Sequence, residues 1–405
     1  MKAVVFHGVG DIRLDEVKDP KLKDPQDAIV ALTASAICGT DLHMIRGTLP
    51  GMEKGIILGH EGVGVVEEIG KNVRNLSEGD RVVIPSTIAC GNCSYCRAGY
   101  YAQCDNANPN GPEGGTAFFG GPKESGSFDG LQAEKARVPF ANVGLVKLPA
   151  DVSDDEAILL SDIVPTAYMA AENAQIKPGN TVAIFGLGPV GQFCIACAQL
   201  MNAGRIIAID TIPSRLEMAR AQGAEVIDFN AEDPLETIKA LTGGIGVDRV
   251  IDAVGVDANH PHSGPGKKLA GTKHAKEKKN VAPHTNVKNG NWEPGDAPSI
   301  VLEWAVEAVA KAGTVSIIGV YGEKNSFAIG QATNKNLTVT MGNCNHRRYI
   351  PQLVELVRSG VLTPSAVLTQ VEPMTSAIDA YKAFDKREPG WIKVKLEPEQ
   401  KKMAA

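Results

Sequence analysis

The chain has 405 residues, more than one compact core usually holds, and this length predicts two domains. Hydrophobic residues make up 43% and charged residues 22%, as in ordinary globular proteins, while a net charge of −6 excludes the strongly basic surface expected of a protein that binds nucleic acid or an anionic membrane. No signal peptide and no run of about 18 apolar residues is recognisable, so we expect a cytoplasmic protein.

The first 160 residues predict a mostly β domain. Short strand-like runs at residues 28–33, 62–69 and 81–84 are separated by Gly, Pro and Asp. Four of the eight cysteines follow in one loop, with Cys90-x-x-Cys93-x-x-Cys96 and then Cys104. These spacings predict a closed, structural Cys₄ zinc site. The alternative is four unligated thiols in a surface loop.

Three more candidate metal ligands are dispersed along the chain: Cys38, His60 and Asp162. Three protein ligands leave a fourth position for water or a substrate oxygen, as catalytic zinc requires. Spacing alone does not assemble them, and each has an ordinary alternative, namely a core thiol, a buried histidine and a helix cap. His7 and His346 have no local support and are expected to be ordinary.

From residue 164 onward, strands and helices alternate, which predicts a doubly wound parallel sheet. Gly223 is expected to end one helix in a left-handed conformation, and Ser299 is expected to cap another. Cys194 and Cys197 lie on a helix and are expected in the core. The predicted strands are 182–185, 205–210, 225–228, 249–253 and 314–319, and the predicted helices are 190–202, 214–222, 234–242, 300–310 and 350–359.

A glycine-rich turn lies at the start of this alternation. Gly186-x-Gly188-x-x-Gly191 follows a strand and opens a helix, and Asp210 stands roughly 20 residues further on, which is the dinucleotide-binding fingerprint. The helix N-terminus would face the pyrophosphate, and the Asp210 carboxylate would accept ribose hydroxyls and repel a 2′-phosphate. The pattern therefore favours NAD over NADP. The alternative is a glycine-rich turn that binds nothing.

The segment 257–298 interrupts the alternation. It has no periodicity and is rich in Gly, Pro, Lys, Asn and His, and it follows a strand on the edge where such sheets bind ligands. Connections of this kind are usually about 2–6 residues long. We therefore expect either a lid over the cofactor or a disordered insert.

Taken together, the motifs resemble those of the zinc-dependent alcohol dehydrogenases of the medium-chain dehydrogenase/reductase superfamily. The resemblance extends over residues 1–395 apart from the insert. It is carried by Cys38-Gly39-Thr40-Asp41-Leu42-His43, Gly59-His60-Glu61-Gly62-Val63-Gly64, the four-cysteine lobe and Gly186-Leu187-Gly188-Pro189-Val190-Gly191.

The resemblance implies an α/β protein with a GroES-like catalytic domain (1–162), a Rossmann NAD-binding domain (163–343) and a C-terminal return to the catalytic domain (344–405). It implies NAD and two zinc ions per chain as cofactors, and a homodimer or homotetramer in which the edge strand at 337–341 can pair across subunits.

The resemblance also assigns roles to single residues. Glu61 would lie behind the catalytic zinc, and Asp41 would orient His60. Thr40 would take the substrate proton and pass it through the nicotinamide ribose to His43, which would open to solvent. Pro189, Val190, Arg215 and Thr166 would contact the cofactor, although Arg215 has a solvated charge on a helix as an equal alternative, and His43 a plain surface histidine.

Most members of the superfamily have cysteine at the position of Asp162. An aspartate there, together with the insert, resembles the branch of glutathione-independent formaldehyde dehydrogenase and formaldehyde dismutase, in which NAD stays bound through turnover. The expected function is hydride transfer between NAD(H) and a short aldehyde hydrate or alcohol. The alternatives are an alcohol or polyol dehydrogenase with exchanging NAD, and a catalytically silent NAD-binding redox sensor.

Overall fold

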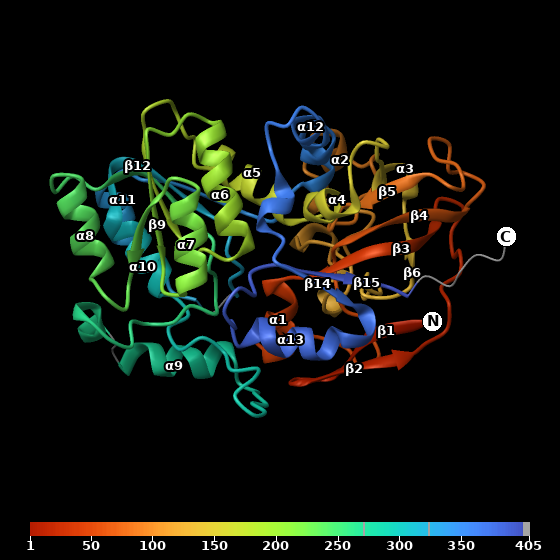
Figure 1. The fold of residues 1–405 in the computed structure, drawn as a ribbon, viewed down its shortest axis with the longest axis horizontal. Coiled ribbons are helices and arrows are strands. Elements are labelled where there is room, and N and C mark those ends of the chain that lie inside the picture. Colours follow the sequence, from red (N-terminus) through yellow and green to blue (C-terminus); the bar gives the residue numbers. More distant parts are fainter. Residues whose placement is uncertain (270–271, 323–324, 400–405) are drawn as a thin grey trace.

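The computed structural model describes residues 1–269, 272–322 and 325–399, and it contains two large sheets lying side by side (Figure 1). One sheet is fully parallel, with the strand order β10-β9-β8-β11-β12-β13, which is the doubly wound Rossmann order. Its strands are β8 (Thr181–Phe185), β9 (Arg205–Asp210), β10 (Glu225–Asp228), β11 (Val247–Asp252), β12 (Val309–Ile317) and β13 (Thr338–Met341).

Helices cover both faces of this sheet, which explains why its central strands are continuously apolar. Val182 and Ile184 of β8 enter one hydrophobic core, whereas Ala183 and Phe185 enter the core on the opposite face. The predicted parallel sheet is therefore confirmed. The covering helices are α5 (Ile163–Asn173), α6 (Pro189–Leu200), α7 (Pro213–Ala221), α8 (Pro234–Leu241), α10 (Ile300–Ala308) and α11 (Ile329–Asn334).

The other sheet is mostly antiparallel and joins both ends of the chain. Its strands are β3 (Ala28–Ile37), β4 (Gly62–Ile69), β5 (Arg81–Ile84), β6 (Lys135–Val138), β7 (Val146–Lys147), β14 (Gln370–Pro373) and β15 (Val394–Glu397), while β1 (Lys2–Gly8) and β2 (Asp11–Glu16) pair separately. Around it lie α1 (Gly39–Arg46), α2 (Ser94–Arg97), α3 (Ala141–Gly144), α4 (Asp154–Leu160), α12 (His346–Arg358) and α13 (Ala377–Asp385). Strand β15 lies antiparallel beside β3, so the last part of the chain completes the first sheet.

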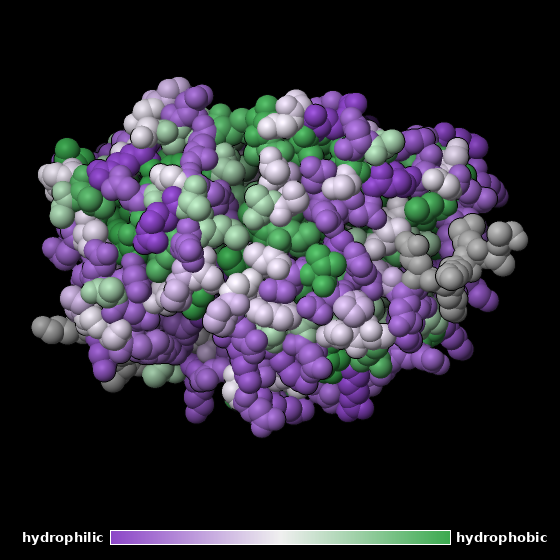
Figure 2. Space-filling model, viewed as in Figure 1, coloured by the Kyte–Doolittle hydropathy of each residue, from purple (hydrophilic) through white to green (hydrophobic). Residues whose placement is uncertain are grey.

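The insert has more structure than its sequence predicts, since it carries the helix α9 (Thr272–Val281). Its residues 270 and 271 lie outside the described residues. Trp292 is 4% exposed and packs in a core with residues of β1, α1 and α13, and Asn286 donates a side-chain hydrogen bond to the Val9 carbonyl at 2.9 Å. These contacts with the other half of the molecule favour the lid over the disordered insert. Hydrophilic residues cover the lower edge of the face in Figure 2, where α9 lies.

Several details differ from the sequence-based expectations, and β12 begins at Val309, inside the helix predicted at 300–310. Ser299 precedes α10 but does not cap it, because its buried hydroxyl donates instead to the carboxylate of Glu277 on α9. Helix α12 begins at His346, four residues earlier than predicted. Gly223 does adopt a left-handed conformation, with φ +87°, just after α7. Among the described residues, no helix is long and apolar enough to cross a membrane.

Candidate active site and zinc centres

A cleft runs between the two sheets, along the carboxyl ends of the parallel strands. Residues of both halves line it, which is the usual position of a ligand site in an open α/β sheet. From the parallel sheet come Gly186, Gly188, Asp210, Ala253, Val254 and Gly319, and from the other half come Cys38, Thr40, His43, Arg46 and Arg387.

The glycine turn has the close approaches that its sequence predicts. A Cβ on Gly191 would lie 1.8 Å from the carbonyl oxygen of Gly186, so only glycine lets α6 start this close to β8. Gly186 itself has φ +86°. A Cβ on Gly188 would meet only Arg215, at 4.0 Å, which leaves space for a ligand at the α6 N-terminus. Pro189 and Val190 also line the cleft.

Asp210 is held at the end of β9 by three backbone N–H groups. Its Oδ2 accepts from Leu187 at 2.7 Å, and its Oδ1 accepts from Thr211 at 2.7 Å and from Ile212 at 3.0 Å. The Nη1 atom of Arg215 lies 3.7 Å from Asp210 Oδ2. The Arg215 side chain is 15% exposed and lines the cleft, which favours a contact with the cofactor over a solvated charge.

The structure brings Cys38, which lines the cleft, together with His60 and Asp162, and Glu61 lies beside them. All four are buried, and one ligand atom from each lies within 4.8 Å of the others. Asp162 Oδ2 lies 3.7 Å from Cys38 Sγ and 3.3 Å from His60 Nε2. In a tetrahedral zinc site, with bonds of about 2.3 Å to sulfur and about 2.0–2.1 Å to nitrogen or oxygen, these pairs would lie about 3.6 Å and about 3.3 Å apart.

The donor set and its surroundings fit a zinc ion. Asp162 precedes α5, but its side chain makes no capping hydrogen bond, so the alternative of a helix cap is wrong. Without a metal, burial raises the pKa of the Cys38 thiol, against the opposing effect of His60. A divalent cation would stabilise the thiolate, as at other thiolate-metal sites.

Asp41 lies behind His60, as the resemblance implies. Its Oδ1 is 3.1 Å from His60 Nδ1, although the two buried atoms are not aligned for a hydrogen bond. Asp41 Oδ2 is held by the backbone N–H of Cys38 at 2.9 Å. Burial lowers the pKa of His60, but the charges of Asp41 and Cys38 outweigh this effect and raise it well above its ordinary value.

The interpretation of His346 as an ordinary histidine is wrong. Its Nε2 lies 2.6 Å from Asp162 Oδ1, and its Nδ1 lies 3.2 Å from the Thr87 hydroxyl. The hydrogen bonds from His346 and His60 outweigh burial and hold the pKa of Asp162 well below its ordinary value. Thr166 also differs from expectation: its hydroxyl donates to Asp162 Oδ1 at 3.0 Å, and the side chain does not line the cleft.

We predict that His346→Phe speeds the removal of zinc from the Asp162 site by a chelator by about 10–100-fold, the usual effect of losing a partner behind a metal ligand. His346→Gln keeps a side-chain N–H, so its rate of zinc release should lie between those of His346→Phe and the wild type. The measurement is the release of zinc in a colorimetric chelator assay. His7→Ala, which removes a half-exposed histidine near the N-terminus, is the control. Equal release from all four proteins would contradict the assignment.

His43 does not open to solvent, because the first residue of the insert covers it. Its Nδ1 lies 2.7 Å from Asp257 Oδ2, and Arg46 Nη1 donates to the same oxygen at 2.9 Å. His43 is 7% exposed, so the alternative of a plain surface histidine is also wrong. Burial raises the pKa of Asp257, but Arg46 and His43 outweigh burial and leave it below its ordinary value.

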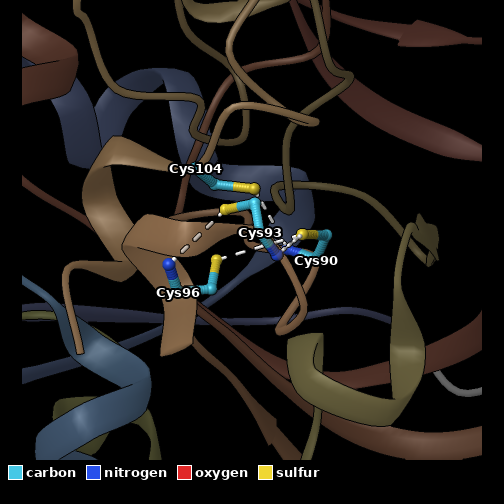
Figure 3. Close-up of side chains that lie close together, drawn as sticks. All are labelled: Cys90, Cys93, Cys96 and Cys104. Atoms are coloured by element: carbon cyan, nitrogen blue, oxygen red, sulfur yellow. Dashed lines mark hydrogen bonds between the residues drawn. The ribbon is translucent and has the colours of Figure 1, made fainter. Parts of the chain in front are cut away.

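The four clustered cysteines turn their sulfur atoms toward one another (Figure 3), and one Sγ from each lies within 4.8 Å of the others. Cys90 and Cys96 are 4.0 Å apart at sulfur. The Sγ of Cys90 accepts from the backbone of Asn92 and Cys93 at 3.4 Å each. Burial raises the pKa of Cys90, but these N–H donors lower it overall to about 7. The arrangement fits a structural zinc ion and offers no position for substrate.

Comparison with known proteins agrees with this fold. The family model of the alcohol dehydrogenase GroES-like domain matches residues 24–150, and that of the zinc-binding dehydrogenases matches residues 189–262. A zinc-type alcohol dehydrogenase-like protein of Bacillus subtilis is 37% identical, over 98% of this chain and 100% of its own length. The chain belongs to the zinc-type alcohol dehydrogenases and is an oxidoreductase of that family, whose members act on small molecules.

Two further proteins, one compared by sequence and one by structure, are similar to this chain. The glutathione-independent formaldehyde dehydrogenase of Pseudomonas aeruginosa is 37% identical, over 82% of this chain and 84% of its own. The alcohol dehydrogenase of Thermus sp. ATN1 superimposes with a TM-score of 0.80 at 35% identity, over 98% of this chain and all of its own.

Proposed function

We propose that this chain is a zinc- and NAD-dependent dehydrogenase that oxidises a short aldehyde, as its hydrate, or a short alcohol. The observation that carries the proposal is the cluster of Cys38, His60 and Asp162, because Cys38 also lines the cleft that contains the glycine turn and Asp210. Zinc held by these three residues would supply Lewis-acid polarisation of a substrate oxygen. The second zinc, in the four-cysteine lobe, would only stabilise the fold.

The chain's own residues provide a path for the proton. Thr40 and His43 both line the cleft, and the hydroxyl of Thr40 is proposed to take the substrate proton. Since Asp257 faces Nδ1 of His43, that nitrogen carries the hydrogen and leaves Nε2 as the acceptor. His43 therefore receives the proton on Nε2, and Asp257 stabilises the resulting charge.

Asp210 supports NAD as the cofactor. Its buried carboxylate already accepts three backbone N–H groups and lies at the place where a 2′-phosphate would bring further negative charge. Arg215 and Arg387, which also line the cleft, offer positive charge to a pyrophosphate. The measurement is the KM for NAD against NADP, and a preference for NADP would overturn this part of the proposal.

Asp162 supports an aldehyde as the substrate. A carboxylate is a harder and less electron-donating ligand than the thiolate found in most of the superfamily, which favours binding of hydroxide or of an aldehyde hydrate. A hydrate that gives hydride to NAD becomes an acid. If the NADH stays bound, a second aldehyde takes the hydride back and becomes an alcohol, so that two aldehydes are converted to one acid and one alcohol.

Retention of the cofactor is tested on protein purified without added NAD. Denatured wild-type protein should release close to one NAD(H) per chain, and a panel of formaldehyde, longer aldehydes and polyols should show aldehyde turnover without added NAD. Absence of NAD(H) from the supernatant would overturn the bound-cofactor mechanism. Turnover of alcohols or polyols that depends on added NAD would then favour the alternative of an alcohol or polyol dehydrogenase with exchanging NAD. No turnover with any substrate would favour the alternative of a catalytically silent redox sensor.

Asp257→Asn should speed NADH release, because Asp257 joins the insert to Arg46 and His43 of the other half. We expect the release rate to rise at least about tenfold. A tenfold change requires the loss of only about 1.4 kcal/mol from the contact of Asp257 with Arg46 and His43. Stopped-flow fluorescence of NADH measures this rate. Asp379→Asn removes an exposed carboxylate paired with Lys382 and should leave the rate unchanged. Equal rates for all three proteins would contradict a role for the insert in holding the cofactor.

We also propose that the chain assembles as a homodimer or homotetramer through the free edge of the parallel sheet. Strand β13 ends the sheet, and its last residue, Met341, is 64% exposed, while Ile329 at the start of α11 is 71% exposed. Mass measurement by light scattering, with Met341→Lys as a variant expected to dissociate the assembly, tests this proposal. A monomeric wild type would overturn it.

A further inference from the structure

A third group of potential metal ligands lies in the insert, apart from both zinc centres. His260 and His262 stand at its start and Asp296 near its end, and one ligand atom from each lies within 4.8 Å of the others. Asp296 lies 36 residues after His260, so the chain returns to the same place to assemble the group. None of the motifs in the sequence includes these three residues.

The spacing of the donor atoms is compatible with a metal ion shared by the three side chains. His260 Nδ1 lies 2.9 Å from Asp296 Oδ1, and His262 Nε2 lies 3.6 Å from Asp296 Oδ2. In a tetrahedral site with bonds of about 2.0–2.1 Å, neighbouring donor atoms lie about 3.3 Å apart, between these two values. The two imidazole rings are 4.6 Å apart at their centroids and inclined by 57°, and each has one nitrogen near the carboxylate.

The backbone around the group is fixed by its own hydrogen bonds. The N–H of His260 donates to Asp296 Oδ1 at 2.9 Å, and the N–H of His262 donates to Asn230 Oδ1 at 2.8 Å. The N–H of Ala297 donates to the Ala258 carbonyl at 3.0 Å. The three ligands are therefore preorganised. His262 is 59% exposed, which leaves an entry path and room for water as a fourth ligand.

We propose that His260, His262 and Asp296 form a third metal site, for a divalent transition metal, that joins the two ends of the insert. Two imidazoles and one carboxylate suit zinc and its neighbours rather than magnesium or calcium. Asn230, which holds His262, also donates to the hydroxyl of Thr211 at 2.7 Å, and Thr211 follows Asp210. The metal therefore stiffens the part of the insert that lies beside the adenosine end of the cleft.

The test uses the zinc-loaded full-length enzyme after dialysis, which keeps the two buried centres filled. Zn²⁺ alone is then titrated in, and bound metal is measured by equilibrium dialysis with elemental analysis. The wild type should bind about one further zinc per chain. His262→Ala should not, whereas His7→Ala, which removes the histidine of the single His7–Asp15 pair at 2.7 Å, should bind it as the wild type does.

Hydrogen exchange provides a second measurement on the same proteins. Added Zn²⁺ should slow amide exchange in segments 257–264 and 293–298 of the wild type and of His7→Ala, but not of His262→Ala. If His262→Ala does not fold, Asp296→Asn is measured against the same criteria. No further zinc on the wild type, or equal binding by the variant and the wild type, would overturn the proposal. Cys38→Ser should still bind the added zinc, which separates this site from the catalytic one.

Discussion

Cys38→Ser is expected to lower kcat/KM by at least about 10³-fold, since removing even a partner behind a metal ligand costs about 10–100-fold. Zinc content after dialysis should fall from about two ions per chain to about one, because a serine hydroxyl stays protonated at neutral pH and binds zinc poorly where a thiolate binds it well. Turnover assays and elemental analysis of the same preparation test both expectations together.

The matched control for this variant is Cys194→Ser. Cys194 is fully buried on α6 and belongs to the hydrophobic core rather than to either cysteine-containing centre. A serine on a helix can donate to a carbonyl of the preceding turn, so this variant should fold and keep both zinc ions and its activity. Full turnover in Cys38→Ser would refute the assignment of the active site. Loss of activity with both zinc ions retained would instead separate catalysis from metal binding at Cys38.

Lys393→Met is expected to destabilise the protein by about 3–5 kcal/mol, the usual cost of leaving one partner of a buried ion pair without the other. Lys393 and Glu61 are both fully buried, and Lys393 Nζ lies 2.5 Å and 2.7 Å from the two carboxylate oxygens. Lys393 Nζ also donates to the Ile37 carbonyl at 3.2 Å. Urea unfolding of the metal-loaded protein, followed by circular dichroism, measures the free energy of unfolding.

The double variant Glu61→Gln/Lys393→Met separates the charge from the packing. If the loss of stability in Lys393→Met comes from the unpaired Glu61 carboxylate, the double variant should recover most of that stability. Lys382→Met, which removes an exposed lysine paired with Asp379, should change the free energy of unfolding by less than about 1 kcal/mol. A double variant as unstable as Lys393→Met would show that Lys393 acts through packing and its bond to Ile37 instead.

The sequence predicts most of the fold because its local signals agree with the tertiary structure. The predicted bounds of β4, β5, β9 and β10 match the structure, since Gly, Pro or Asp flanks these short apolar or alternating runs. The glycine turn and the four-cysteine loop are equally local. Their few residues lie close in sequence, so spacing alone indicates the geometry. The domain boundaries at 162 and 343 remain predictions.

The residues that sequence reasoning misses act across long separations in the chain. His346 reaches Asp162 over 184 residues, and Asp257 reaches His43 over 214. Lys393 lies 332 residues from Glu61. No periodicity links such pairs, because their contact depends on how the two halves pack. A buried carboxylate that must have a partner is the only signal, and it indicates the need for a partner without indicating which residue provides it.

The place of β15 between β3 and β14 has a consequence for synthesis on the ribosome. The N-terminal sheet cannot close until residues 394–397 have been synthesised, whereas the parallel sheet is complete once Met341 has been synthesised. At typical elongation rates of about 5–20 residues per second, the nascent N-terminal third waits tens of seconds for its last strand. During that time the Glu61 carboxylate has no Lys393, which holds it in the finished protein. A stop codon before residue 393 would therefore leave the N-terminal domain, which is made first, without its last strand.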